Sequence, residues 1–206
     1  MRLVGVSQRV DFLSNRSEYR DGLDQRLIAF IKLSGFLPVP VPNKLILSSD
    51  RDKRKKELLN WVKGLDLSAF VLSGGNDVSD NKERDDNENW LLDYAEDKKL
   101  PVLGICRGMQ ILGVRNGGLL KSIDHHSNSL HEIKGKISGS VNSFHKFSFE
   151  QLPNDFNLLA KAKDGCIEAI EHKKMPWEGW MWHPERFEKF RKSDVERLKY
   201  IFKVVA

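Results

Sequence analysis

The sequence predicts an α/β fold in which a mainly parallel sheet is covered by helices on both faces and extended by antiparallel strands. In the first 115 residues, short apolar runs alternate with segments of helical period, which is typical of parallel βα units. From residue 130 onward, short strand-like runs follow one another directly, which indicates antiparallel strands. The 206 residues suffice for one sizeable core, and we expect a single domain over residues 1–206.

The first half of the chain supplies the parallel part of this fold. Strands are expected over residues 2–8, 36–41, 69–73 and 101–105, and helices over residues 19–33, 51–62, 88–98 and 109–115. Pro38 and Pro40 stand at alternate positions of one strand, which suits the edge of a sheet. Residues 9–17 are expected to form a polar connection. The charged residues 80–89 indicate a solvated loop, and a mobile flap over a site is the alternative.

The second half supplies the antiparallel strands and a closing helix. Strands are expected over residues 130–137, 140–149, 158–162, 166–170 and 179–182. The amphipathic segment 193–204 predicts the last helix.

Residues 104–108 read Gly-Ile-Cys-Arg-Gly and fall where a buried strand turns into a helix. This is the cysteine form of the Gly-x-Ser-x-Gly nucleophile elbow, whose small residues let the nucleophile project from a sharp turn. The amide of Arg107 can hold an oxyanion there, and the helix N-terminus favours ionisation of the Cys106 thiol. A buried structural cysteine is the alternative.

A nucleophilic cysteine needs a base and a group that orients the base. Trp182-His-Pro-Glu185 offers both. Pro184 favours an extended His183, and if Glu185 is extended too, its carboxylate lies on the same side as the imidazole. Glu185 would then accept from one imidazole nitrogen and leave the other facing Cys106. A plain turn at a strand end is the alternative.

The segment Ser73-Gly-Gly-Asn-Asp77 follows another expected strand. In an open α/β sheet, sites form outside the carboxyl ends of the strands. The amide of Gly75 could therefore join that of Arg107 in an oxyanion hole.

Together these segments resemble the class I glutamine amidotransferase family, and within it the γ-glutamyl hydrolase branch. The resemblance is carried, in family order, by Leu72-Ser-Gly-Gly-Asn-Asp-Val78, Gly104-Ile-Cys-Arg-Gly-Met-Gln110, Val141-Asn-Ser-Phe-His145 and Trp182-His-Pro-Glu185. It implies the flavodoxin-like sheet of that family and a catalytic triad of Cys106, His183 and Glu185.

The resemblance also implies a binding site for the glutamyl group. Gln110 matches the family position that contacts this group, and Ser143 and His145 match the segment that lines its pocket. Many relatives carry glutamine where this chain has Phe147, a departure that concerns the pocket of the leaving group.

The resemblance implies that the Cys106 thiolate attacks the δ-carbonyl of a γ-glutamyl amide, and that the resulting thioester hydrolyses to glutamate. We expect a free-standing hydrolase, because only a glutaminase-like domain is evident. Net charge of +5 and compact size suit a phosphorylated conjugate, such as a γ-glutamyl-CDP-amidate of capsule polysaccharide biosynthesis. A glutaminase subunit that passes ammonia to a separate synthase is the alternative, and a non-catalytic member of the fold is a third.

Composition bounds the remaining functions. Cys106 and Cys166 make no disulfide framework, no run is long enough to span a bilayer, and no signal peptide is expected after Arg2, so we expect a cytoplasmic protein. No nucleic-acid-binding motif accompanies the basic charge. Residues 124–126, Asp-His-His, could ligate a metal together with His131, but their spacing implies no geometry and favours a solvated loop. We expect no metal and no cofactor; the expected partners are the γ-glutamyl substrate and, in the alternative, a synthase.

Overall fold

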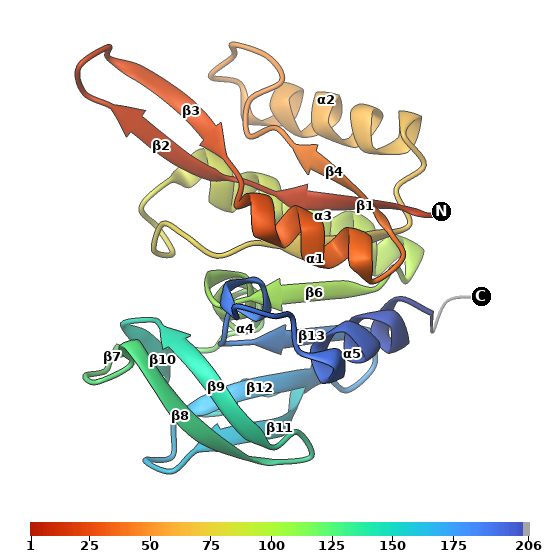
Figure 1. Cartoon of the computed structure of the whole chain (residues 1–206). Helices are drawn as coiled ribbons and strands as arrows, with labels where there is room; N and C mark the ends of the chain where they lie inside the picture. The colour runs from red at the N-terminus through yellow and green to blue at the C-terminus, as the bar shows by residue number, and fades with distance from the viewer. Residues whose placement is uncertain (204–206) are drawn as a thin grey trace.

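The computed structural model describes residues 1–203, and Figure 1 shows their arrangement. Nine strands of this part form one mixed sheet in the order β4-β1-β5-β6-β13-β12-β11-β8-β9. Neighbours from β4 to β13 run parallel, and neighbours from β13 to β9 run antiparallel. The predicted fold class, a mainly parallel core with added antiparallel strands, is confirmed.

The strands are short and mostly lie close to their expected positions. The parallel part consists of β1 (Leu3–Ser7), β4 (Leu37–Val41), β5 (Ala69–Leu72), β6 (Val102–Ile105) and β13 (Trp177–Trp180). The antiparallel part consists of β8 (Ser127–Gly135), β9 (Gly139–Phe144), β11 (Phe156–Ala162) and β12 (Ile167–His172). Two small hairpin-like pairs stand apart from this sheet: β2 (Arg9–Leu13) with β3 (Glu18–Gly22), and β7 (Leu120–Ser122) with β10 (Phe147–Phe149).

Helices cover both faces of the parallel strands, as Figure 1 shows. One face carries α1 (Gln25–Leu33) and α5 (Lys192–Lys203), whose Phe30 and Leu198 pack in one hydrophobic cluster with Leu103 of β6. The other face carries α2 (Arg51–Gly64), α3 (Lys82–Lys98) and α4 (Arg107–Arg115), whose apolar side chains pack in a second cluster with Val102 and Leu72. Because alternate strand residues face opposite sides, the apolar strands supply both clusters at once.

Local sequence explains where the early helices begin. Asp24, Asp50 and Asn81 stand at the N-caps of α1, α2 and α3, where each side chain accepts a hydrogen bond from an amide of the first turn. None of these helices spans a membrane: within residues 1–203, no helix combines the length and the apolar character that crossing a bilayer requires.

Several expected elements differ in the structure. Residues 9–17 and the start of the expected helix 19–33 form the β2–β3 hairpin, because alternating side chains in this stretch pair across two strands. Helix α3 begins at Lys82, so the expected loop 80–89 is largely helical. The expected strand 140–149 is split into β9 and β10, and β7 was not expected. Strand β13 pairs parallel with β6 as well as antiparallel with β12. Residue 204, the expected end of the last helix, lies outside the described residues.

Candidate active site

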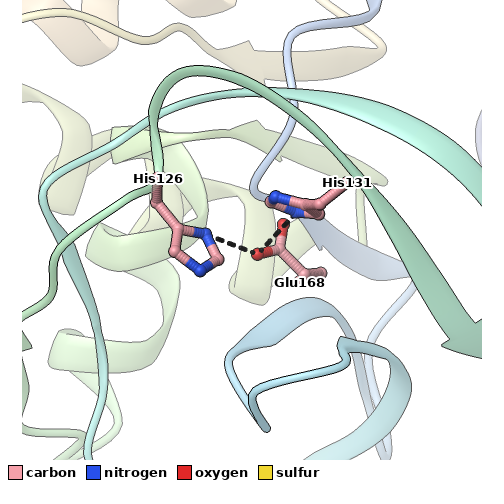
Figure 2. A group of neighbouring side chains, drawn as sticks. All are labelled: His126, His131 and Glu168. Carbon is pink, nitrogen blue, oxygen red and sulfur yellow. Dashed lines mark ion pairs between the residues drawn. The ribbon is translucent and has the colours of Figure 1, made fainter.

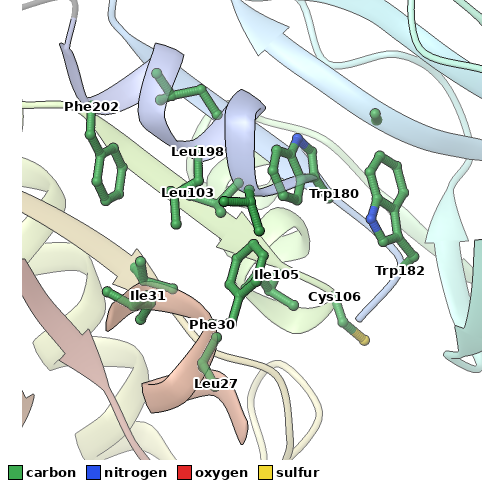
Figure 3. Close-up of a cluster of buried hydrophobic side chains, with 14 of the residues drawn as sticks. Leu27, Phe30, Ile31, Leu103, Ile105, Cys106, Trp180, Trp182, Leu198 and Phe202 are labelled. Carbon is green, nitrogen blue, oxygen red and sulfur yellow. The ribbon is translucent and has the colours of Figure 1, made fainter. Parts of the chain in front are cut away.

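Cys106 occupies the turn between β6 and α4. Its φ of 52° and ψ of −107° are unusual for a residue with a side chain, and such backbone strain concentrates at functional sites. Glycine is required beside it, because a Cβ at Gly108 would lie 2.1 Å from the carbonyl oxygen of Leu72. Cys106 is 7% exposed and lies at the end of the α1/α5 cluster, where Figure 3 shows its sulfur directed away from the labelled apolar side chains. The predicted elbow geometry is therefore present.

His183 and Glu185 meet directly after β13. His183 is extended, with φ −103° and ψ 96°, as Pro184 predicts. The expectation of an extended Glu185 is wrong, because residues Pro184–Arg186 form a 3₁₀ turn. This turn still brings the two side chains together, with 2.5 Å between Nδ1 of His183 and Oε1 of Glu185. Both side chains are buried.

The surroundings of His183 favour its protonated form. Burial opposes protonation, but hydrogen bonds with Cys106 and Glu185 outweigh it and raise the pKa of His183 to about 9. The imidazole therefore has a sulfur on one side and a carboxylate on the other. This arrangement can accept a proton from a thiol and hand it to a leaving group.

Two residues that the sequence analysis did not single out hold the histidine segment in place. The side chain of Asn142 in β9 donates to the carbonyl oxygen of His183 and accepts from its amide, both at 2.8 Å. Arg26 of α1 donates to the backbone carbonyls of Glu185 at 2.7 Å and Glu188 at 3.2 Å. Asn142 lies inside a quoted motif, whereas nothing local in the sequence marks Arg26.

The expected oxyanion groups lie around the same histidine. Gly75 has a φ of +84°, which favours glycine, and it lines the pocket that contains Cys106. A Cβ at Gly74 would lie only 2.6 Å from Cε1 of His183, so the loop can approach the imidazole only because this residue is glycine. The amide of Arg107 belongs to the first turn of α4, whose N–H groups have no acceptor within the helix.

A buried ionic network fixes both the loop and the elbow. Arg84, fully buried in α3, donates to the carbonyl oxygens of Ser73 at 2.7 Å and Gly74 at 3.1 Å, and also to that of Gly75. Glu88, also fully buried, pairs with Arg84 at 3.0 Å and with the side chain of Arg107. Burial opposes ionisation of Glu88, but Arg107 and Arg84 outweigh it and hold its pKa below the usual range.

This network corrects the expectation of a solvated loop or mobile flap at residues 80–89. The charges of this segment are partly buried because they face partners that come from other parts of the chain. Asp85 pairs with the side chain of Arg107, and Asp86 pairs with Arg54 of α2 at 3.0 Å.

The expected glutamyl-binding residues fall into two groups. Gln110 and His145 line the pocket of Cys106, and both side chains donate to the carbonyl oxygen of Phe147, at 3.2 and 3.0 Å. Ser143 is fully buried and donates to the carbonyl oxygen of His126 at 2.6 Å, so it lies behind this lining. Behind the lining, too, His126 comes together with two residues that could hold a metal, His131 and Glu168.

Two pockets adjoin at His183. The Cys106 pocket has a volume of about 300 Å³ and is lined by Cys106, Gln110, His145 and Lys146 among others. The Arg9 pocket has a volume of about 310 Å³ and is lined by Arg9, Gly22, Asp24 and Leu27 among others. Gly75, His183 and Arg186 line both pockets. A substrate could therefore place one end in each pocket with its reacting bond beside His183.

Comparisons with known proteins agree with this geometry. Residues 46–201 match the family described as glutamine amidotransferase class-I. The chain is 36% identical over 192 residues to the γ-glutamyl-CDP-amidate hydrolase of Campylobacter jejuni, a match that covers 89% of this chain and 90% of that protein. It is 28% identical over 130 residues to a subunit of the glutamine-hydrolysing GMP synthase of Methanocaldococcus jannaschii, covering 58% of this chain and 65% of the other.

Solved structures share the fold. A GMP synthase subunit from Thermoplasma acidophilum superimposes with a TM-score of 0.68 at 22% identity, covering 98% of this chain and 92% of the other. A glutamine amidotransferase from Thermotoga maritima gives a TM-score of 0.63 at 15% identity, covering 98% and 84%. The chain therefore belongs to the class-I glutamine amidotransferase family of enzymes, to which its sequence motifs pointed.

Proposed function

We propose that this protein is a cysteine hydrolase that cleaves a γ-glutamyl amide bond and releases glutamate and an amine-bearing product. One observation carries the proposal: the strained elbow residue Cys106 shares a pocket with His183, whose Nδ1 is held 2.5 Å from Glu185. Nucleophile, base and orienting carboxylate are the three parts that acyl transfer through a thioester needs. The resemblance of the chain to a γ-glutamyl-CDP-amidate hydrolase supports the same reaction.

In this proposal the Cys106 thiolate attacks the δ-carbonyl carbon, and the amides of Gly75 and Arg107 hold the resulting oxyanion. Protonated His183 gives its proton to the departing nitrogen as the C–N bond breaks. His183 then removes a proton from water, which attacks the thioester and regenerates the thiolate with release of glutamate. Glu185 keeps the ring oriented throughout both steps.

For the substrate, we propose a γ-glutamyl group joined to a phosphorylated amine such as a CDP-amidate. The similarity to the Campylobacter hydrolase supports this choice, and so does the charge of the adjoining pockets. Arg186 lines both pockets and is held over the ring of Phe144 at 4.5 Å, while Arg9 and Lys146 line one pocket each. Guanidinium and ammonium groups at this position favour a phosphorylated leaving group.

The product would keep its phosphoanhydride bond and remain an activated donor. We propose that it serves a transferase that modifies surface polysaccharide, and that the reaction takes place in the cytoplasm, where nucleotide-linked donors are made.

A second candidate is a glutaminase subunit that delivers ammonia to a separate synthase. The similarity to a GMP synthase subunit favours it. This candidate predicts that glutamine is cleaved slowly by the isolated chain and faster with the synthase present.

The test measures glutamate release from γ-glutamyl-CDP-amidate, from glutamine and from an uncharged γ-glutamyl anilide. The proposal expects the conjugate to be turned over with the highest kcat/KM. Arg186→Gln should raise KM for the conjugate about tenfold, more than for the anilide, because charged hydrogen bonds are lost. Arg20→Gln is the matched control, since Arg20 is exposed and lines neither pocket. Best turnover of glutamine, or equal effects of Arg186→Gln on both substrates, would contradict the proposed substrate.

A further inference from the structure

Behind the wall of the Cys106 pocket, three histidines surround one buried carboxylate. His126 and His131 come from the segment around β8, His145 follows β9, and Glu168 lies in β12. Glu168 is fully buried, and Figure 2 shows His126 and His131 on two sides of its carboxylate. The expected solvated loop around residues 124–131 is wrong for His126, which is buried.

The distances within this cluster, which we call the histidine cluster, are those of ligands around a metal. Oε1 of Glu168 lies 3.4 Å from Nδ1 of His126, 3.2 Å from Nε2 of His131 and 3.4 Å from Nε2 of His145. Nδ1 of His126 lies 3.3 Å from Nε2 of His145. A zinc ion with bonds of about 2.0–2.1 Å places the corners of its ligand tetrahedron about 3.3 Å apart. Four edges of the cluster match this separation.

The directions of the groups also fit a shared centre. Among the described residues, neither oxygen of Glu168 nor Nε2 of His131 has a hydrogen-bond partner, although they lie within hydrogen-bonding distance of each other. Groups that point to one ion between them lie this close without pointing at each other. A buried carboxylate with no hydrogen-bond partner is costly unless a cation satisfies it.

Outer contacts set two of the rings for metal binding. Nε2 of His126 lies 2.7 Å from Asp164, and Nδ1 of His145 lies 3.0 Å from the carbonyl oxygen of Phe147. If these outer nitrogens donate, then Nδ1 of His126 and Nε2 of His145 present lone pairs to each other and to Glu168. Metal-ligating histidines typically donate their second N–H to a carboxylate or a carbonyl in this way.

The charge of the site agrees. Burial opposes ionisation of Glu168, but the three histidines outweigh it and hold its pKa far below the usual range. The carboxylate is therefore ionised and needs positive charge beside it, from protonated imidazoles or from a cation.

We propose that His126, His131, His145 and Glu168 bind a divalent transition-metal ion, with zinc as the preferred ion. Three imidazoles and one carboxylate are a borderline ligand set that suits zinc better than calcium or magnesium. A closed set of four protein ligands makes the ion structural. It would tie β8, β9 and β12 together beneath the segment 143–147, which lines the Cys106 pocket. The inference does not depend on the proposed reaction.

The test uses the full chain with Cys106→Ala and Cys166→Ser, so that no thiol competes for metal. The protein is freed of metal with a chelator and then titrated with zinc against a chromophoric competitor. We expect one zinc per chain, and with cobalt the visible absorption bands of tetrahedral coordination. Glu168→Gln should weaken zinc binding by about tenfold or more, by comparison with losses at metal sites elsewhere. His125→Asn is the matched control, since His125 is exposed and outside the cluster.

A gain-of-signal variant covers the case in which Glu168→Gln does not fold. In the same thiol-free chain, His131→Cys should keep the cobalt adduct and add a thiolate-to-cobalt charge-transfer band, because the new sulfur would be a ligand. Failure to bind zinc stoichiometrically at micromolar concentration would overturn the proposal. So would affinity unchanged by Glu168→Gln, or a His131→Cys spectrum without the new band.

Discussion

The carboxamide of Asn142 holds both backbone polar groups of His183, accepting from its N–H and donating to its C=O at 2.8 Å each. A reacting imidazole misplaced by about 1 Å can cost a hundredfold in rate. The structure therefore makes Asn142 a positioning residue for the proposed base.

Asn142→Ser should lower kcat by about tenfold to a hundredfold with little change in KM, because the histidine shifts while the pocket remains. Steady-state kinetics on the best γ-glutamyl substrate measure this split. Asn157→Ser, at an exposed position of β11, serves as control and should leave both constants unchanged. A change in KM alone would show that Asn142 acts on substrate binding instead.

Gly74→Ala should impair catalysis without unfolding the protein. The new methyl group would lie 2.6 Å from Cε1 of His183, so either the imidazole or the loop has to move. We expect kcat to fall by about a hundredfold, and the melting temperature to change little. Gly64→Ala is the control, since a Cβ there meets nothing within 4 Å. Full activity of Gly74→Ala would mean that this close approach has no role in the reaction.

Arg84→Met should destabilise the protein strongly, because it leaves Glu88 buried with one partner fewer and removes the donor to three loop carbonyls. Breaking a buried ion pair of this kind costs about 3–5 kcal/mol in unfolding free energy. Urea unfolding followed by circular dichroism measures it. Lys55→Met breaks an exposed pair with Asp93 and should cost less than about 1 kcal/mol. Equal losses in the two variants would contradict the buried network.

The rate should depend on pH through His183. Burial lowers its pKa, but hydrogen bonds with Cys106 and Glu185 outweigh burial and raise it to about 9. Since the protonated ring gives its proton to the leaving nitrogen, kcat/KM should fall as pH rises through about 9. In Glu185→Gln this alkaline limb should move to lower pH. A limb that stays in place would assign it to another group.

Stability should follow the same shift. A raised histidine pKa stabilises the fold fully below about pH 6.5, and this stabilisation is lost as pH rises through the folded value near 9. Glu185→Gln should therefore cost more unfolding free energy at pH 6 than at pH 10. His126 has a pKa raised to about 9 as well, since its hydrogen bond to Glu168 outweighs burial. Its contribution cancels when each variant is compared with wild type.

Local motifs predicted the features whose causes are local. The glycines around Cys106 and the proline after His183 restrict the backbone by themselves, so the elbow and the extended histidine could be read from a few residues. The pairing of His183 with Glu185 was expected, although through a different backbone, because a two-residue separation leaves few alternatives.

Distant partners explain the misses. Arg84 and Glu88 look like solvent-exposed charges in the sequence, and only the fold brings them to the carbonyls of residues 73–75 and to Arg107. The β2–β3 hairpin was missed because its polar alternation lacks a strong turn dipeptide such as Asn-Gly. Glu168 joins His126 from a strand about 40 residues away, a meeting that no spacing rule predicts.

The most direct test of the account is to trap the acyl-enzyme. Wild type, Cys106→Ala and Cys166→Ser are mixed with γ-glutamyl-CDP-amidate, quenched in acid during turnover and measured by intact mass spectrometry with peptide mapping. The account predicts a mass increase of one γ-glutamyl group on Cys106 in wild type and in Cys166→Ser, and neither adduct nor glutamate release in Cys106→Ala. Glutamate release that persists in Cys106→Ala would contradict it.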